Sequence, residues 1–212
     1  MSWQVKYALA HIAEQHRLSG ELVEGELIRI GSQGQPDVLA VISAAREIDA
    51  STAAGYREKH PEIDFLCGYR TTCVWHGEAI DYLEDAGIGW GSAGTLSSAA
   101  LDGDANTASH KTYSFSDRLL RQLGVVREVV REFDRIHRVT LKSDTVIRIG
   151  MIADYEPNAN AVRELWDRFG AVDIAWNINP SGSPSPEAID AGKELGCEVM
   201  KWDDLKGYLR AA

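Results

Sequence analysis

The chain has 212 residues, of which 44% are hydrophobic and 25% are charged, so it can bury a substantial core in one large domain or two small ones. Its formal net charge of −10 argues against a general affinity for nucleic-acid backbones. The sequence shows no signal-peptide pattern, and no apolar run approaches the roughly 20 residues of a membrane span. Its three cysteines have no Cys-x-x-Cys spacing. These features predict a cytoplasmic protein with no membrane partner.

The apolar pattern, taken along the chain, predicts the same order of elements twice. The first set comprises a helix at 3–17, strands at 26–31 and 37–43, a helix at 50–60, a strand at 63–69, a helix at 76–87, a strand at 88–91 and a helix at 93–101. The second comprises a helix at 115–137, strands at 138–142 and 145–152, a helix at 159–169, a strand at 172–178, a helix at 185–195, a strand at 197–201 and a helix at 203–211.

Matching residues recur about 109 positions apart, which favours an internal duplication. Glu78-Ala79-Ile80-Asp81 falls on Glu187-Ala188-Ile189-Asp190, and Gly87 falls on Gly196. The strand that starts at Val38 matches the one at Val146 with a slip of one residue. The predicted fold class is α/β, with two αββαβαβα units whose sheets are mostly parallel and carry helices on both faces. We expect repeats at 1–105 and 115–212, joined by a linker at 106–114.

The helix predicted at 115–137 carries an apolar stripe together with five arginines, and a sixth, Arg138, follows it. Residues 1–105 contain 7 Lys and Arg against 16 Asp and Glu, whereas residues 106–212 contain 15 against 16, so any acidic partner should meet the second half. One interpretation is a solvated, salt-bridged face on a core helix. The alternatives are a homodimer interface along the stripe, or a nucleic-acid surface with contacts from Arg127, Arg131 and Arg135.

Ligands of open parallel sheets bind beyond the carboxyl ends of the strands, which directs attention to the polar residues there. The catalytic candidates are four acids, Asp64, Asp173, Asp154 and Glu156, and the ligand-binding candidates are Arg46, Arg70 and Asn179. Asp64 and Asp173 occupy the same place in the two repeats, where they could face a shared cleft or could cap a strand edge. The other candidates differ between the two repeats, which is typical of a duplicated fold that has a single functional site.

Three local motifs have a structural and a chemical interpretation. Gly89-Trp90-Gly91-Ser92-Ala93-Gly94 is a G-x-G-x-x-G sequence but lacks the full strand-helix-strand context of a dinucleotide site, and is typical of a tight turn. Ser185-Pro186-Glu187 predicts a capped helix start. Cys73 and His76 could form a thiol-imidazole pair or a buried cysteine beside a helix start. The six histidines show no metal-ligand spacing, so no metal site is expected. The sequence does not indicate which cofactor, if any, the chain binds.

The stretch from Val172 to Leu209 resembles the closing half of Mrr-type restriction-endonuclease-like domains. The matching order is a strand, a polar loop, an Ala-and-Gly helix, a short strand and a helix with Asp204-Leu205. Asp37, after Pro36, suits the family's first metal-binding acid, but Val41-Ile42-Ser43-Ala44 stands where the Asp/Glu-x-Lys should follow. The resemblance implies nuclease ancestry with a lost or rebuilt centre, and hence a binding or regulatory protein. The alternative is an enzyme or sensor for a nucleotide or anionic metabolite, with its site between the repeats.

Overall fold

The computed structural model describes residues 2–70 and 72–212, with the backbone alone at residues 111 and 112. Within this part, the chain is a mixed α/β protein with eight α-helices and three sheets of parallel and antiparallel strands. It divides into two compact units, unit 1 at Met1–Lys111 and unit 2 at Thr112–Ala212. No helix in the described ranges is long and apolar enough to cross a bilayer.

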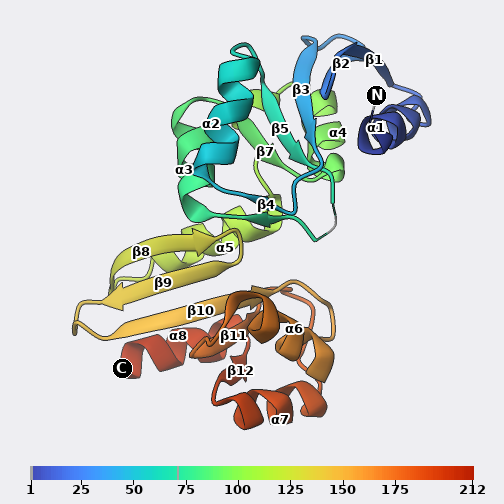
Figure 1. Ribbon diagram of the computed structural model, residues 1–212. Helices are drawn as coiled ribbons and strands as arrows, with labels where there is room; N and C mark the ends of the chain where they lie inside the picture. The colour runs from blue at the N-terminus through green and yellow to red at the C-terminus, as the bar shows by residue number, and fades with distance from the viewer. Residues whose placement is uncertain (1, 71) are drawn as a thin grey trace. The chain divides into compact units, whose positions relative to one another are not determined.

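Unit 1 contains a five-stranded sheet in the order β1-β2-β3-β5-β7 (Figure 1). Strands β1 to β3 are antiparallel, and β3, β5 and β7 are parallel. The elements are α1 (Trp3–Ala13), β1 (Leu18–Glu24), β2 (Leu27–Ser32), β3 (Val38–Ser43), β4 (Glu47–Ile48), α2 (Ala50–Lys59), β5 (Phe65–Gly68), β6 (Val74–Trp75), α3 (Gly77–Asp85), β7 (Gly89–Gly91), α4 (Ala93–Asp102) and a 3-10 turn at Ala105–Thr107. Strands β4 and β6 form a separate parallel pair.

Unit 2 contains a five-stranded sheet in the order β8-β9-β10-β11-β12, again with three antiparallel strands followed by parallel ones (Figure 1). Its elements are α5 (Lys111–Arg121), β8 (Val126–Phe133), β9 (Ile136–Leu141), β10 (Val146–Ile152), α6 (Ala159–Phe169), β11 (Ile174–Asn177), α7 (Pro186–Leu195), β12 (Glu198–Met200) and α8 (Trp202–Ala211). The two five-stranded sheets therefore share strand order and direction.

The core of unit 1 consists of two clusters, because successive side chains of a strand point to opposite faces of the sheet. Ala40 and Ile42 of β3 join one cluster with residues of α1 and α4, whereas Val41 joins the other with residues of α2 and α3. In unit 2, residues of α5 and α8 form a cluster with β9, β10 and β11, and the buried residues of α6 and α7 include Leu165 and Ala188.

The helix predicted at 115–137 is wrong. Helix α5 ends at Arg121, and Val126–Phe133 forms strand β8, which pairs with β9. Gly124 and the β-branched Val126, Val129 and Val130 favour this change from helix to strand, and the hydrogen bonds of β9 complete it. The matching strand β1 of unit 1 was missed, because its side chains after Leu18 are exposed and show no buried alternation. Each unit thus begins with three antiparallel strands instead of the two expected.

Corresponding positions of the two sheets lie 109 residues apart. The pair Leu22 and Ile28 across β1 and β2 corresponds to Arg131 and His137 across β8 and β9, and each pair is followed by a bulge. The backbone N–H of Ile42 donates to the carbonyl oxygen of Glu26 over 2.9 Å, as that of Met151 does to Arg135. The one-residue slip expected between the strands at Val38 and Val146 is therefore wrong.

The helix ends keep the same spacing. Asp49 caps α2 by accepting a hydrogen bond from the backbone N–H of Thr52, and Asn158 caps α6 by accepting one from Ala161. Gly87 and Gly196, which follow α3 and α7, have φ angles of +66° and +79°, where a side chain would be strained. Ser185 caps α7 with Pro186 at its first turn, as expected from the sequence.

Candidate ligand site in unit 2

Asp64 and Asp173 bind backbone in equivalent ways. An oxygen of the Asp64 carboxylate accepts a hydrogen bond from the backbone N–H of Leu39 over 2.8 Å, and an oxygen of Asp173 accepts one from Arg148 over 2.7 Å. In return, the backbone N–H of Asp64 donates to the carbonyl oxygen of Leu39, and that of Asp173 donates to the carbonyl oxygen of Arg148, each over 2.9 Å. These contacts tie the loop after a helix to the central strand, so they give the two acids a structural role in their own units.

Arg70 and Asn179 also make matching contacts. Arg70 Nε donates to the carbonyl oxygen of Ala44 over 2.6 Å, and Asn179 Nδ2 donates to that of Ala153 over 3.3 Å. Each side chain thereby joins the end of one parallel strand to the end of the next. Arg46 and Glu156 lie exposed on the loops that follow β3 and β10.

Asp154 differs from the other strand-end candidates because it lines a pocket. The pocket has a volume of about 140 Å³ and lies where β10 ends, between α6, the N-terminal part of α5 and the turn from β8 to β9. Its lining combines four charged side chains with apolar and aromatic ones: Arg135, Asp154, Glu164, Arg168, Tyr113, Phe169, Met151, Ile152, Ala153, Ala161 and Leu165. The site is therefore both charged and partly apolar, which suits the orientation of a small polar ligand.

Arg135 is fixed by its neighbours. Its Nη2 atom donates to an Asp134 carboxylate oxygen over 2.7 Å, and its guanidinium lies 5.2 Å from the ring centre of Tyr113 and 5.6 Å from that of Phe169. Such contacts hold a planar guanidinium in one orientation. Arg135 thus contributes a rigid wall to the pocket, and the charge of Asp134 balances its own.

Glu164 and Arg168 lie one turn apart on the exposed side of α6, a spacing that often pairs opposite charges. Neither makes an ion pair within 4.0 Å in the part of the chain that the structure describes, and the same holds for Asp154. Among the described residues, the pocket side chains Arg168, Glu164 and Asp154 therefore have no ion-pair partner.

Tyr113 is buried at the wall of the pocket. Burial raises the pKa of its hydroxyl, an effect that the nearby charge of Arg135 partly opposes and that of Asp134 reinforces. The phenol therefore stays protonated at neutral pH.

The equivalent place in unit 1 is occupied by contacts within the protein. Tyr56, which corresponds to Leu165, has its hydroxyl 2.9 Å from Ser43 Oγ at the end of β3. Lys59, which corresponds to Arg168, pairs with Glu26 over 2.5 Å, and Glu26 stands where unit 2 has Arg135. The polar groups at this strand end satisfy one another in unit 1, whereas those of unit 2 face the pocket.

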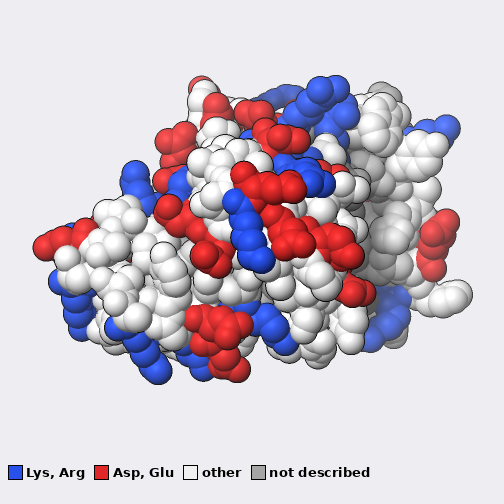
Figure 2. Space-filling model, turned by 90° about the horizontal axis from the view of Figure 1, so that it is seen from below, with Lys and Arg blue, Asp and Glu red and all other residues white. Residues whose placement is uncertain are grey.

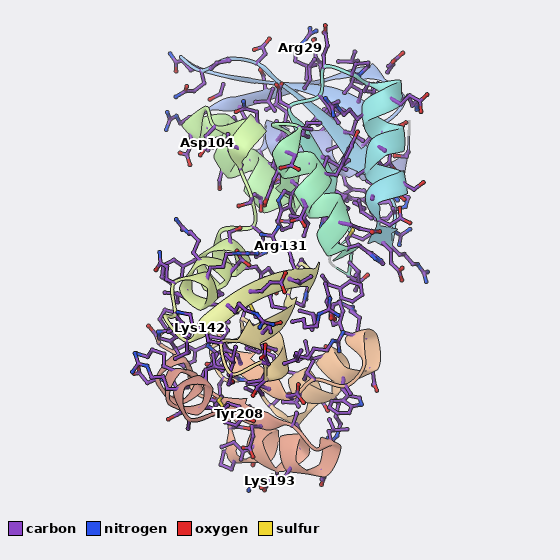
Figure 3. The ribbon with its side chains drawn as sticks, turned by 90° about the vertical axis from the view of Figure 1, so that its left-hand side faces the viewer. Arg29, Asp104, Arg131, Lys142, Lys193 and Tyr208 are labelled. Atoms are coloured by element: carbon purple, nitrogen blue, oxygen red, sulfur yellow. The ribbon has the colours of Figure 1, made fainter. Side chains whose placement is uncertain are left out.

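A buried charged cluster lies next to the pocket in unit 2. Asp117 of α5 contacts Arg121 Nε at 2.8 Å, His137 Nε2 at 3.0 Å and Arg131 Nη2 at 3.8 Å. Arg131 extends from β8, and its side chain is only 9% exposed (Figure 3). The corresponding residues of unit 1 are all apolar: Ala8, Ile12, Leu22 and Ile28. We call Asp117, Arg121, Arg131 and His137 the buried ionic cluster; Arg121 forms its solvent-facing edge, with 47% of its side chain exposed.

The charge states of this cluster follow from its burial and contacts. Burial lowers the pKa of His137 and outweighs the contact with Asp117, which raises it; the charges of Arg131 and Arg121 also lower it, so the imidazole is neutral at pH 7. Burial alone would raise the pKa of Asp117, but the contacts with His137 and Arg121 outweigh it and hold that pKa well below its usual range. His137 Nδ1 has no hydrogen-bond partner among the described residues.

The three arginines predicted to form a nucleic-acid surface do not share a helix face. Arg127 lies on β8 and pairs with Asp144, Arg131 is in the buried ionic cluster, and Arg135 is held by Asp134. The prediction rested on the helix at 115–137, which is absent. Figure 2 shows acidic and basic side chains interspersed over one face of the protein.

The glycine-rich motif and the thiol-imidazole pair have structural positions. A Cβ atom at Gly89 would lie 1.9 Å from the carbonyl oxygen of Ala105, so close packing requires this glycine, and Ser92 caps α4. Cys73 is buried and His76 begins α3. Over residues 2–70 and 72–212, no group of three or more His, Cys, Asp or Glu side chains is arranged to hold a metal ion.

Sequence reasoning singled out Asp154 as a catalytic candidate and Arg135 as a nucleic-acid contact, but it did not single out Tyr113, Glu164 or Arg168. Glu164 and Arg168 resemble an ordinary solvent-exposed pair on an amphipathic helix. Tyr113 falls in the region expected to be a linker. A position-by-position comparison of the two units could have given the signal, because Arg135 and Arg168 stand where unit 1 has Glu26 and Lys59.

Comparison with known proteins gave no match: no family model, no curated protein and no solved structure is similar to this chain.

Proposed function

We propose that the chain is a binding or regulatory protein made of two copies of one restriction-nuclease-like unit, with helices on both faces of each sheet and a ligand site in unit 2. The ligand is a small charged metabolite. The single observation that carries this proposal is the pocket at the end of β10, where Asp154, Glu164 and Arg168 face solvent. In unit 1, Ala45 and Gly55 stand in place of the two acids, and Lys59, the counterpart of Arg168, pairs with Glu26.

The duplication is supported by hydrogen bonds as well as by residues. The contacts of Asp64 and Asp173, the contacts of Arg70 and Asn179, and the helix caps all recur at a spacing of 109. Side chains as different as Arg and Asn make the same backbone contact. A common ancestral unit explains such agreement more simply than independent folding of two sequences.

The nuclease ancestry is supported by element order. A helix, three antiparallel strands, a helix and a parallel strand open each unit, and the segment that resembles the Mrr-type domains closes the second. Val41-Ile42-Ser43-Ala44 stands where that family carries the Asp/Glu-x-Lys residues, and Val41 and Ile42 are buried apolar side chains of β3. A binding role is therefore proposed instead of cleavage.

The location proposed is the cytoplasm, because Cys67, Cys73 and Cys197 are buried free thiols. The proposal includes neither a nucleic acid nor a second copy of the chain as a partner. Both predictions depended on the basic and apolar faces of the helix expected at 115–137.

The proposal is tested by thermal unfolding in the presence of small charged metabolites at millimolar concentrations. A compound that binds only the folded chain raises the melting temperature. The matched variants are Ala161→Phe, which fills the pocket, and Ala159→Phe, which lies on the same helix outside the lining. At least one compound should stabilise the native chain and Ala159→Phe but not Ala161→Phe. The absence of any shift, or an equal shift in Ala161→Phe, would overturn the proposal.

A further inference from the structure

We infer that the pocket of unit 2 accepts a small zwitterion, a molecule that carries one carboxylate and one ammonium group a few bonds apart, as a small α-amino acid does. This inference rests on the proposed function and adds the chemical class of the ligand.

The first argument is the arrangement of charge. Arg168 can receive a carboxylate, and Glu164 and Asp154 can receive an ammonium group. Glu164 and Arg168 do not pair with each other although they are one turn apart, so a ligand with both charges can bridge them. A simple anion would meet one available cation and two carboxylates, and a simple cation would leave Arg168 without a partner.

The second argument is size. A volume of about 140 Å³ holds on the order of five water molecules, since each takes roughly 30 Å³ in the liquid. Glycine, alanine and serine have a similar number of heavy atoms, whereas sites for drug-sized ligands measure roughly 300–1,000 Å³. A nucleotide is therefore too large to enter the pocket as a whole.

The third argument is rigidity. Arg135 is held between the rings of Tyr113 and Phe169, and both Tyr113 and Arg135 belong to elements that the buried ionic cluster joins. Asp117 follows Tyr113 by one helical turn, and Arg131 and His137 flank Arg135 along the hairpin. The walls are thus preorganised, which lowers the entropic cost of binding a compact ligand.

The experiment compares L-alanine with the two compounds that each lack one of its charged groups, propionate and ethylamine, and with inorganic phosphate. Binding is followed by amide chemical shifts of the full chain at constant pH and ionic strength. Alanine, glycine or serine should shift the amides of Ala153, Asp154 and Ala161, which line the pocket. Propionate, ethylamine and phosphate should bind at least tenfold more weakly.

Two variants assign the charges. Arg168→Gln should weaken the binding of alanine at least tenfold by removing the partner of the carboxylate, and Glu164→Gln should do so by removing a partner of the ammonium group. Arg163→Gln is the matched control, because Arg163 lies on the same helix and pairs with Glu194 outside the pocket. It should bind alanine as the native chain does.

The outcomes separate the inference from the proposed function. If phosphate or propionate shifts the same amides and binds as tightly as alanine, the inference of a zwitterionic ligand is wrong, whereas the proposed ligand site is retained. If Arg168→Gln and Glu164→Gln bind alanine unchanged, the charge assignment is wrong. If none of the probes moves the pocket amides and no metabolite stabilises the chain, both proposals fail.

Discussion

The same positions have opposite chemistry in the two units. Where unit 1 packs Ala8 and Ile12 of α1 against Ile28, unit 2 buries Asp117 against His137, and the more exposed Arg121 pairs with Asp117. Where unit 1 joins Lys59 to Glu26, the counterpart Arg168 of unit 2 lines a pocket without such a partner among the described residues. Backbone contacts agree at the same spacing, so the fold tolerates both solutions. The difference teaches that the frame is set by strand pairing and caps, while the side chains around α5 and α6 were free to specialise.

The largest effect should come from breaking the buried ionic cluster. Asp117→Ala leaves Arg131 and Arg121 without their shared carboxylate, and we expect the free energy of unfolding to fall by about 3 kcal/mol in urea titration. A fourfold variant with the residues of unit 1, Asp117→Ala, Arg121→Ile, Arg131→Leu and His137→Ile, should recover most of this loss, because apolar groups can replace a buried ion pair. Full stability of Asp117→Ala would contradict the assigned contacts.

The equivalence of Asp64 and Asp173 can be tested by removing each carboxylate. Asp64→Ala and Asp173→Ala each lose one hydrogen bond from a backbone N–H to a charged group, so each should cost about 1.5 kcal/mol. The comparison is sharpened if the two losses agree within experimental error in the same titration. A large loss at one position with none at the other would show that the two contacts are not equivalent.

A third, smaller effect is a pH dependence of the unfolding free energy near pH 6, to which only unit 2 should contribute. Because the pKa of His137 is lowered, the unfolded chain binds a proton near pH 6 that the folded chain does not. Stability should therefore decrease as the pH falls from about 7.5 toward the folded pKa, by at most about 1.4 kcal/mol per pH unit. The slope should vanish in His137→Gln and persist in His16→Gln, whose ring is exposed. Asp117 acts in a separate window, where its stabilisation is lost as the pH falls below the usual range for Asp.

The smallest effect is expected on β8 itself. Arg127 and Asp144 are both exposed, so Arg127→Gln should change the unfolding free energy by less than about 0.5 kcal/mol. Arg131→Gln, four residues away and buried, should be clearly more damaging. Equal effects of the two substitutions would remove the distinction between the surface and the cluster.

The sequence predicted the parallel part of each unit well, since buried strands such as 172–178 and capped helices such as 185–195 have strong local patterns. It failed at β1 and β8. The side chains of β1 are mostly exposed, and those of β8 repeat at threes and fours, so only pairing with β2 and β9 defines these strands. The error at 115–137 also hid the site, because the β8–β9 turn is what brings Arg135 next to Tyr113.

The buried ionic cluster was missed for a related reason. Asp117 and Arg121 have the spacing of a solvent-exposed pair on a helix, and His137 was expected at the end of the same helix. Asp117 is nevertheless buried against His137 of the neighbouring strand β9, and no local pattern carries this information.

The hydrogen bonds of Asp64 and Asp173 also allow local opening to be measured at equivalent positions of the two units. The amides of Leu39 and Arg148 are each protected by one carboxylate in one unit, and they exchange with solvent only when that contact opens. Their deuterium exchange rates therefore report local opening in the two halves of the chain separately. An occupied pocket should slow exchange at Arg148 while that at Leu39 stays the same, if the halves open independently.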